Sequence, residues 1–193
     1  VIQDERFMAL ISGSIGAEFG TVFLPVNAPV TLEKHIQKHG QKVVRTRAFF
    51  GEFMREMLKA GENDQMMIYA DGLYATLKIM EFMARHGYSL NDLLDRTPVF
   101  HLVKQDIPVS WADKGRVIRR LAEEYPEIQD GEALGGIRLN HENATSLIMP
   151  DEDRPLCRIY VEAFSQEIAE SLTDFYRSKI ENICQETDGP FKA

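Results

Sequence analysis

The stretch GTVFLPVNAPVTLEKHIQKHGQKVVRT, residues 20–46, decides the fold class, because it predicts a strand, a helix and a second strand in succession. A short apolar run rich in β-branched residues follows Gly20. The segment TLEKHIQKHG then reads as a helix with Thr31 as its N-cap and Gly40 just past its end. The valine-rich segment KVVRT is the next strand. Strands that alternate with helices predict a sheet with at least one parallel pairing and helices packed on its faces.

The segments on either side extend this α/β pattern through residues 1–99. Apolar residues at three- and four-residue spacing predict a first helix within QDERFMALISGSIGAEF and a later one within EFMREMLKAG. We expect QMMIYA to be a short strand, followed by a long helix in DGLYATLKIMEFMARHG. Four apolar residues lie in line on that long helix: Leu73, Leu77, Met80 and Ala84.

A second unit is expected over residues 100–193. Pro98 and Pro108 flank an extended segment, which is typical of a domain boundary. The segment DKGRVIRRLAEEY predicts a helix, and three short strands, GGIRLN, TSLIM and LCRIYVEA, precede a last helix that starts near Ser165. An apolar stripe runs along that helix: Phe164, Ile168, Leu172, Phe175, Tyr176, Ile180 and Ile183. The predicted fold class is therefore α/β for the first unit and a small α+β layer for the second.

Composition and charge exclude several classes of protein. A formal charge of -8 argues against a binder of duplex nucleic acid, which needs clustered Lys and Arg. No apolar run approaches the roughly 18 residues of a membrane span. Cys157 and Cys184 are far apart and are expected to be reduced, partly buried thiols, so we expect a cytoplasmic protein. The first residue is Val1, and we expect the chain to be a piece of a longer polypeptide.

Several short motifs follow one another in an order that resembles a known family. The segment 20–46 ends in Arg-Thr, the long helix opens with Asp-Gly, and DGEALGGIRLN is followed by PLCRIYVEA. This order resembles the C-terminal half of the α-D-phosphohexomutases, the family of phosphomannomutase and phosphoglucomutase, over nearly the whole chain. The resemblance implies that residues 1–99 are like the family's third domain and that residues 100–193 are like its fourth.

The loop before the last predicted strand departs from the family's pattern. Family members carry a phosphate-binding loop that reads approximately Arg-Pro-Ser-Gly-Thr-Glu-Pro, and this chain reads MPDEDRP at residues 149–155. Phosphate is held by an Arg fork, hydroxyl groups and exposed backbone N–H groups, so three acids make a poor phosphate site. A solvated acidic turn is the plain interpretation, and a cation site, a partner-docking loop and retained phosphate binding stay open. The residues of this degenerate phosphate loop are Asp151, Glu152, Asp153, Arg154 and Arg158.

The sugar-binding loop of the family is also missing. Family members have Gly-Gly-Glu-x-Ser-Gly-His before the Asp-Gly helix, and here Glu62 is the only acid that fits the pattern. Arg45 and Thr46 match the family's Arg-Thr strand end, where a structural role is as plausible as a sugar contact. The family's catalytic serine loop and Asp-rich magnesium loop have no counterpart in this sequence. The resemblance therefore implies no catalytic residue, metal or cofactor here, with magnesium expected only in the parent enzyme.

Two other features of the sequence have a possible binding or packing role. His35 and His39 stand four residues apart on one helix, a spacing that can bind a metal, but no third ligand is within sequence reach and surface histidines are the simpler interpretation. The methionines suggest a pliable core or an interdomain seam: Met54, Met57, Met66, Met67, Met80 and Met83.

The resemblance is strongest to the degenerate mutase-like module that is fused to mannose-1-phosphate guanylyltransferases, in which a Pro-Asp-x-Asp/Glu-x-Pro loop occurs. It implies a non-catalytic module whose partners are upstream domains of the same polypeptide. The alternatives are the sugar- and phosphate-binding half of a phosphomannomutase or phosphoglucomutase, and an allosteric sensor that binds a sugar phosphate through Arg45, Arg154 and Arg158. The sequence does not decide between a monomer and a homo-oligomer.

Overall fold

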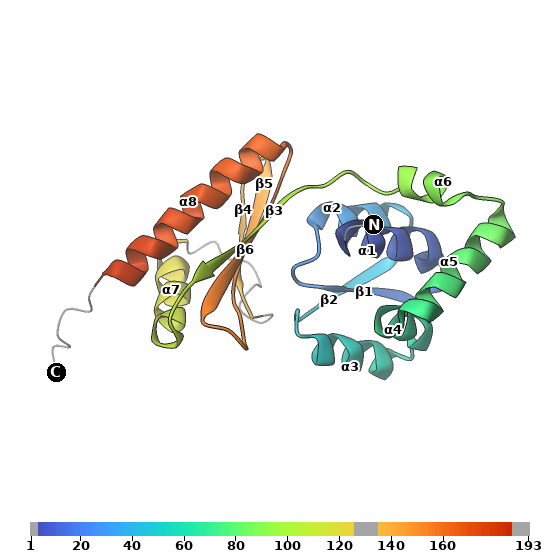
Figure 1. Ribbon diagram of the computed structural model, residues 1–193, viewed down its shortest axis with the longest axis horizontal. Coiled ribbons are helices and arrows are strands. Elements are labelled where there is room, and N and C mark those ends of the chain that lie inside the picture. Colours follow the sequence, from blue (N-terminus) through green and yellow to red (C-terminus); the bar gives the residue numbers. More distant parts are fainter. Residues whose placement is uncertain (1–3, 126–134, 187–193) are drawn as a thin grey trace. The chain divides into compact units, whose positions relative to one another are not determined.

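The computed structural model describes residues 4–125 and 135–186 (Figure 1). They divide into two compact units, residues 1–99 and residues 100–193. Both units combine strands with packed helices, so the predicted mixed α/β class is confirmed. None of the helices in these described ranges is long and apolar enough to cross a membrane.

The first unit surrounds a small parallel sheet with helices. Strand β1 (Thr21–Pro25) pairs in parallel with β2 (Lys42–Thr46), and α2 (Val30–Lys38) connects them, as the strand, helix, strand pattern predicted. The other elements are α1 (Asp4–Ser14), the 3-10 helix η1 (Ile15–Glu18), α3 (Phe50–Ala60), α4 (Asn63–Ala70), α5 (Gly72–His86) and α6 (Leu90–Asp95). The core of the sheet is provided by β1, whose Val22 and Leu24 are fully buried.

The start of α2 differs from the prediction. Its N-cap is Pro29, not Thr31, and Pro29 has an extended backbone with ψ of 140°. The guanidinium of Arg45 donates hydrogen bonds to the carbonyl oxygens of Pro25, Ala28 and Pro29. These bonds hold the chain out of the helix up to Pro29, so that helix α2 begins at Val30. The end agrees better with the sequence, since Gly40 follows the last turn with φ of 82°.

The segment QMMIYA was wrongly predicted as a strand, because it forms most of helix α4. The free edge of β1 is instead satisfied by two side chains of this region. The buried amide of Gln65 accepts a hydrogen bond from Phe23 N and donates one to Phe23 O, both at 3.2 Å. Glu62 Oε1 accepts from Thr21 N at 2.8 Å. These side chains provide the backbone partners that a neighbouring strand would otherwise supply.

Helix α5 forms where it was expected, but its aligned apolar residues do not face the core. Leu73, Leu77 and Met80 are 70%, 56% and 58% exposed, and Ala75 on the opposite face is 1% exposed. The methionines divide in the same way. Met57 is buried in a cluster against which Met54 and Met66 pack, while Met67 and Met80 are exposed.

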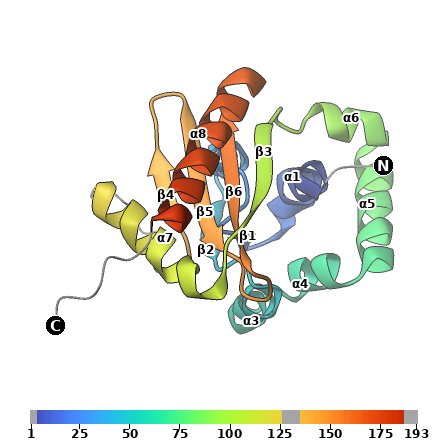
Figure 2. The ribbon, with the colours of Figure 1, turned by 60° about the vertical axis from the view of Figure 1, so that its left-hand side comes forward.

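The second unit is a two-layer α+β arrangement. Its sheet has the order β3-β6-β5-β4 and is antiparallel throughout. The helices α7 and α8 pack on one face of this sheet (Figure 2). The bounds are β3 (His101–Pro108), α7 (Trp111–Glu124), β4 (Ile137–Asn140), β5 (Ala144–Pro150), β6 (Leu156–Ala163) and α8 (Gln166–Gln185).

Alternation along β6 positions the functional side chains discussed below. Cys157, Ile159 and Val161 point into the core with the helices, so Arg158 between them points to the other face. The last helix α8 buries only part of its apolar stripe. Ala169, Thr173, Tyr176, Ile180 and Ile183 are buried, while Phe164, Ile168 and Phe175 are exposed.

The substitution Gln65→Leu tests whether the edge of β1 depends on this amide. We expect it to lower the free energy of unfolding of the first unit by about 2–3 kcal/mol, because two buried backbone groups of Phe23 lose their partner. Denaturant unfolding measures this loss, and hydrogen exchange at the Phe23 amide should accelerate. The matched control is Gln37→Leu, an exposed glutamine bonded to Glu33, which should change stability by less than about 0.5 kcal/mol. Equal effects of the two substitutions would contradict this role of Gln65.

Candidate functional site

The loop between β5 and β6 is organised around the carboxylate of Asp151. Its Oδ1 accepts hydrogen bonds from the backbone N–H groups of Asp153 at 3.0 Å and Arg154 at 2.9 Å. The backbone N–H of Asp151 in turn donates to Leu156 O at 3.0 Å, which closes the loop. The Asp151 side chain is only 13% exposed. The turn is therefore not fully solvated, although Glu152 and Asp153 beside it are exposed.

Two arginines reach the second oxygen of the same carboxylate. Arg154 Nη2 lies 3.2 Å from Asp151 Oδ2, and Arg158 Nη2 lies 3.1 Å from it. Arg158 also holds Asp106 with a two-point contact, Nε to Oδ1 at 2.6 Å and Nη2 to Oδ2 at 3.3 Å. The register of β3 with β6 makes this pair, because Asp106 lies directly opposite Arg158. Two carboxylates and two guanidinium groups thus form one cluster.

A buried lysine supports the loop from the helix side. Lys114 on α7 is 8% exposed and donates to the backbone oxygens of Asp151 and Arg154. Its ammonium also lies 3.6 Å from the centre of the Trp111 ring, a cation–π contact. Three partners compensate for removing this cation from water, so the position of the loop is fixed relative to α7.

Local electrostatics keep both carboxylates ionised. The hydrogen bond from Arg158 lowers the pKa of Asp106 below its ordinary value, although partial burial opposes this. For Asp151, partial burial raises the pKa, but the backbone N–H groups of Asp153 and Arg154 and the Arg154 guanidinium outweigh burial and lower it overall. The pKa of Arg158 is raised by its bond to Asp106. At neutral pH the cluster therefore contains two negative and two positive charges.

The donors around Asp151 are the kinds of group that hold a phosphate. Backbone N–H groups in a tight turn and guanidinium groups are the usual ligands of a phosphate dianion. Here both kinds of donor bind a carboxylate that belongs to the loop itself. The acids of the loop therefore do more than repel an anion, because Asp151 occupies the donors that an anion would need.

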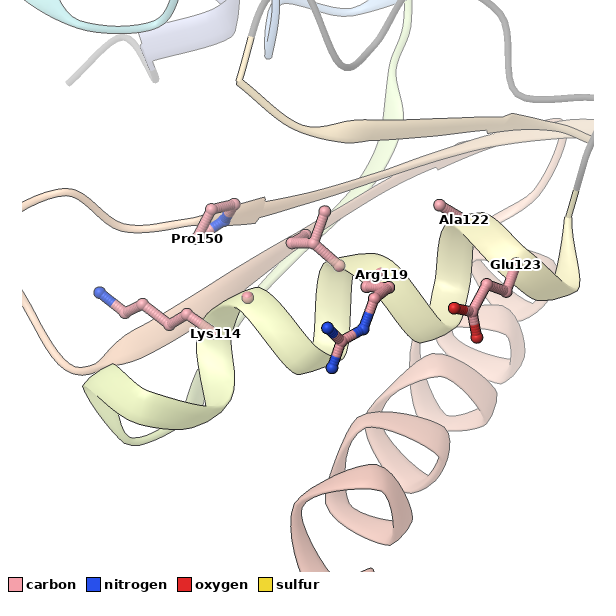
Figure 3. A pocket seen from close by; sticks show the side chains of 7 residues that line it. Lys114, Arg119, Ala122, Glu123 and Pro150 are labelled. Atoms are coloured by element: carbon pink, nitrogen blue, oxygen red, sulfur yellow. The ribbon is translucent and has the colours of Figure 1, made fainter. Parts of the chain in front are cut away.

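An open groove lies beside this loop, between α7 and the end of β5 (Figure 3). Its volume is about 590 Å³, and it is lined by Lys114, Gly115, Ile118, Arg119, Ala122, Glu123 and Pro150. Lys114 lies at the opposite end of this stretch of helix from Glu123, and its ammonium is bonded to the loop carbonyls. The described lining has two cations, Lys114 and Arg119, and one acid, Glu123. Since Lys114 is bonded to the loop and Arg119 and Glu123 extend away from Pro150, these groups do not converge on one point (Figure 3).

The predicted sugar-side residues are not brought together. Arg45 Nε bonds Glu33 at 2.9 Å, and the rest of its guanidinium holds the carbonyls before α2. Thr46 is 5% exposed at the end of β2. Glu62 caps Thr21 at the start of β1, and the parallel register pairs Thr21 with Lys42, roughly 13 Å along the sheet from Thr46. In this arrangement Arg45 and Glu62 stabilise the backbone of the first unit.

His35 on α2 and His39, the residue that follows the helix as its C-cap, contact each other. Their ring centres are 4.7 Å apart, and His39 Nδ1 bonds His35 O at 2.8 Å. His39 is exposed as predicted, but His35 is partly buried, and burial, followed by the charges of His39 and Lys38, lowers its pKa. Within the described ranges no group of three or more His, Cys, Asp or Glu residues could hold a metal ion.

Comparisons with known proteins place this arrangement in a family context. No family model matches the chain. It is 25% identical over 198 residues to a probable phosphoglucosamine mutase of Pyrococcus horikoshii, covering 94% of this chain and 43% of that protein. It is 26% identical over 148 residues to a phosphoglucosamine mutase of Methanococcus maripaludis, covering 70% and 33%.

Solved structures agree with the sequence relatives. A phosphoglucomutase/phosphomannomutase family protein of Burkholderia thailandensis superposes with a TM-score of 0.73 at 15% identity, over 98% of this chain and 44% of that one. An N-acetylphosphoglucosamine mutase of Aspergillus fumigatus gives 0.59 at 11% identity, over 94% and 44%. The chain is therefore similar in sequence to phosphoglucosamine mutases and shares its fold with part of the solved phosphohexomutase structures. It spans less than half the length of these two relatives.

Sequence reasoning missed two residues that contact the 151–155 loop or its arginines. Asp106 and Lys114 are distant in sequence from the loop, and neither belongs to the motif that carried the resemblance. The order PVFHLVKQDIP showed an extended segment, but only the register of β3 on β6 places Asp106 opposite Arg158. Lys114 was visible only as a lysine on the polar-looking start of a helix, a position that is usually exposed.

Replacing the buried lysine should loosen the loop. We expect Lys114→Met to lower the free energy of unfolding of the second unit by about 1–3 kcal/mol, because the carbonyls of Asp151 and Arg154 lose their donor. The matched control is Arg119→Met, an exposed cation on the same helix, which should cost less than about 0.5 kcal/mol. Denaturant unfolding of both variants measures these changes. A Lys114→Met chain with the wild-type free energy of unfolding would show that the loop does not need this support.

The carboxylates of the cluster also predict a pH dependence. Their pKa values are lower in the folded protein than in the unfolded chain, so the stability they contribute is present above about pH 4 and is lost as the pH falls through the folded values. Asp106→Asn should weaken the second unit at pH 7 and flatten this acid loss. Thermal unfolding between pH 2.5 and 7 measures both effects, with Asp153→Asn as the control. An unchanged slope in Asp106→Asn would contradict the assignment.

Proposed function

We propose that this chain is a non-catalytic, mutase-like module of a protein of sugar-phosphate metabolism. In this proposal its 151–155 loop keeps the shape of a phosphate-binding loop and does not bind sugar phosphate. The single observation that carries the proposal is the carboxylate of Asp151, which takes up the backbone N–H groups of Asp153 and Arg154 together with the guanidinium groups of Arg154 and Arg158. A phosphate ion would have to displace this carboxylate and then lie beside it. Each unit charge about 5 Å away costs roughly 3 kcal/mol at an effective dielectric of 20.

The proposed parent is a mannose-1-phosphate guanylyltransferase, in which upstream domains of the same polypeptide would carry the transferase reaction. The support for this choice is the acidic loop PDEDRP, which is similar to the loop of the modules fused to those enzymes. The phosphoglucosamine mutase relatives support a second candidate, the C-terminal half of a phosphohexomutase. That candidate requires a phosphate site built from other residues, and an upstream serine loop would distinguish it from the transferase. A cytoplasmic location is part of the proposal.

The sensor alternative is weaker for a structural reason. It relied on Arg45, Arg154 and Arg158 as ligands of a sugar phosphate. All three guanidinium groups already hold carboxylates or backbone carbonyls. A ligand would gain little from such donors without first breaking those bonds.

Calorimetric titration tests the proposal on the wild-type chain and on Asp151→Asn. The wild type should give no binding of mannose 1-phosphate, mannose 6-phosphate or inorganic phosphate tighter than millimolar. Asp151→Asn removes the internal anion and leaves the arginines, so we expect it to gain phosphate affinity by at least tenfold.

The control removes a charge without freeing the donors. Asp153 is exposed and lies two residues from Asp151, and Asp153→Asn makes the same change in net charge. We expect the Asp153→Asn chain to bind phosphate no more tightly than the wild type does. Wild-type binding in the micromolar range would overturn the non-catalytic reading and favour the mutase half. A gain of the same size in Asp153→Asn would show that net charge alone controls binding and would overturn the role given to Asp151.

A further inference from the structure

Helix α5 presents an apolar seam to solvent that the first unit does not use. Leu73, Leu77, Met80 and Ala84 follow one another at spacings of four, three and four residues, and the three large side chains are 56–70% exposed. The opposite side of the same helix is the one that packs, with Ala75 buried. Figure 2 shows α5 running along the edge of its unit between α4 and α6. The helix is thus apolar on two opposite faces, and the unit covers one of them.

This spacing is the pattern of a helix that packs against another helix. Residues that alternate three and four apart form a straight seam, and such a seam inserts into the holes of a facing helix. Single exposed apolar residues need no explanation, but four in one line form a contiguous surface.

We propose that α5 is a self-association surface, on which α5 of a second copy of this chain packs in the antiparallel direction. A two-fold axis between Leu77 and Met80 places Leu77 of each copy opposite Met80 of the other copy. It also places Leu73 of one copy opposite the small Ala84 of the other, so that a large side chain meets a small one at both ends of the seam. The surface is therefore complementary to itself, as a two-fold interface requires.

The charges beside the seam select the antiparallel direction. Lys78, Glu81 and Arg85 alternate in sign along one flank of α5, while the other flank carries Thr76 and Met83. In an antiparallel pair the two charged flanks adjoin, so Lys78 of one copy comes near Glu81 of the other. A parallel pair would place the charged flank against Met83. The antiparallel direction also places the N-terminal end of each helix dipole beside the C-terminal end of the other, so that opposite partial charges are adjacent.

The size of the seam limits the affinity. From the exposed fractions of the three large side chains, the seam buries about 350 Å² per copy, or about 700 Å² in total, which is below the roughly 1,200 Å² of a standard stable interface. We therefore expect a weak, reversible dimer, as is typical of interfaces below that size. Its formation does not depend on what the 151–155 loop binds.

Sedimentation equilibrium of the 193-residue chain between about 5 and 500 µM tests the proposal. The wild type should show a reversible monomer–dimer equilibrium, and Leu77→Glu should weaken association by at least tenfold, because each dimer would contain two carboxylates in the seam. The matched control is Leu58→Glu on α3, since Leu58 is 57% exposed and Leu77 is 56% exposed. Leu58→Glu should keep the wild-type equilibrium.

Disulfide trapping tests the direction of packing. A mixture of Leu73→Cys and Ala84→Cys chains should form a crosslinked heterodimer faster than either chain crosslinks with itself. Both results together support the proposal. A wild-type chain that stays monomeric at 500 µM, a Leu77→Glu chain that associates like the wild type, or faster self-crosslinking of the single variants would each overturn it.

Discussion

The bonds from the backbone N–H groups of Asp153 and Arg154 to the Asp151 carboxylate determine the form of the second unit's loop. They turn the chain between β5 and β6 so that its carbonyls meet Lys114 and its carboxylate meets Arg158. Arg158 in turn fixes Asp106 on the neighbouring strand. One internal anion thus connects a loop, two strands and a helix, at the loop that resembles the phosphate-binding loop of the phosphohexomutases.

The first unit shows a related substitution of side chains for a missing element. A parallel pair of strands leaves hydrogen-bonding groups on its outer edges, and those of β1 meet the side chains of Glu62 and Gln65. Arg45 similarly replaces solvent at the carbonyls before α2. Residues that could be assigned to a sugar site by alignment therefore have structural partners. In both units polar side chains complete the fold at positions where a ligand or another strand would serve in a related protein.

Apart from QMMIYA, the sequence was sufficient for the order of the main elements, for a sheet with a parallel pairing in the first unit and for the α+β form of the second unit, because apolar periodicity reports burial directly. It was insufficient for QMMIYA, where a short apolar run fits a strand and a helix equally well and the buried Gln65 gave no local sign of its partner. It also could not show that Leu73 and Leu77 face solvent, since periodicity identifies a face but not what covers it. The Asp106–Arg158 pair needed the strand register, which no local pattern supplies.

A carbon-13 NMR titration of the Asp151 side-chain carboxyl in the folded chain tests whether Asp151 occupies its own anion site. We expect a pKa clearly below the ordinary value of about 3.9 and no change in the Asp153 and Arg154 amide signals on adding inorganic phosphate. An ordinary pKa, together with amide signals that move as phosphate binds, would show that the carboxylate is free and that the loop still holds an external anion.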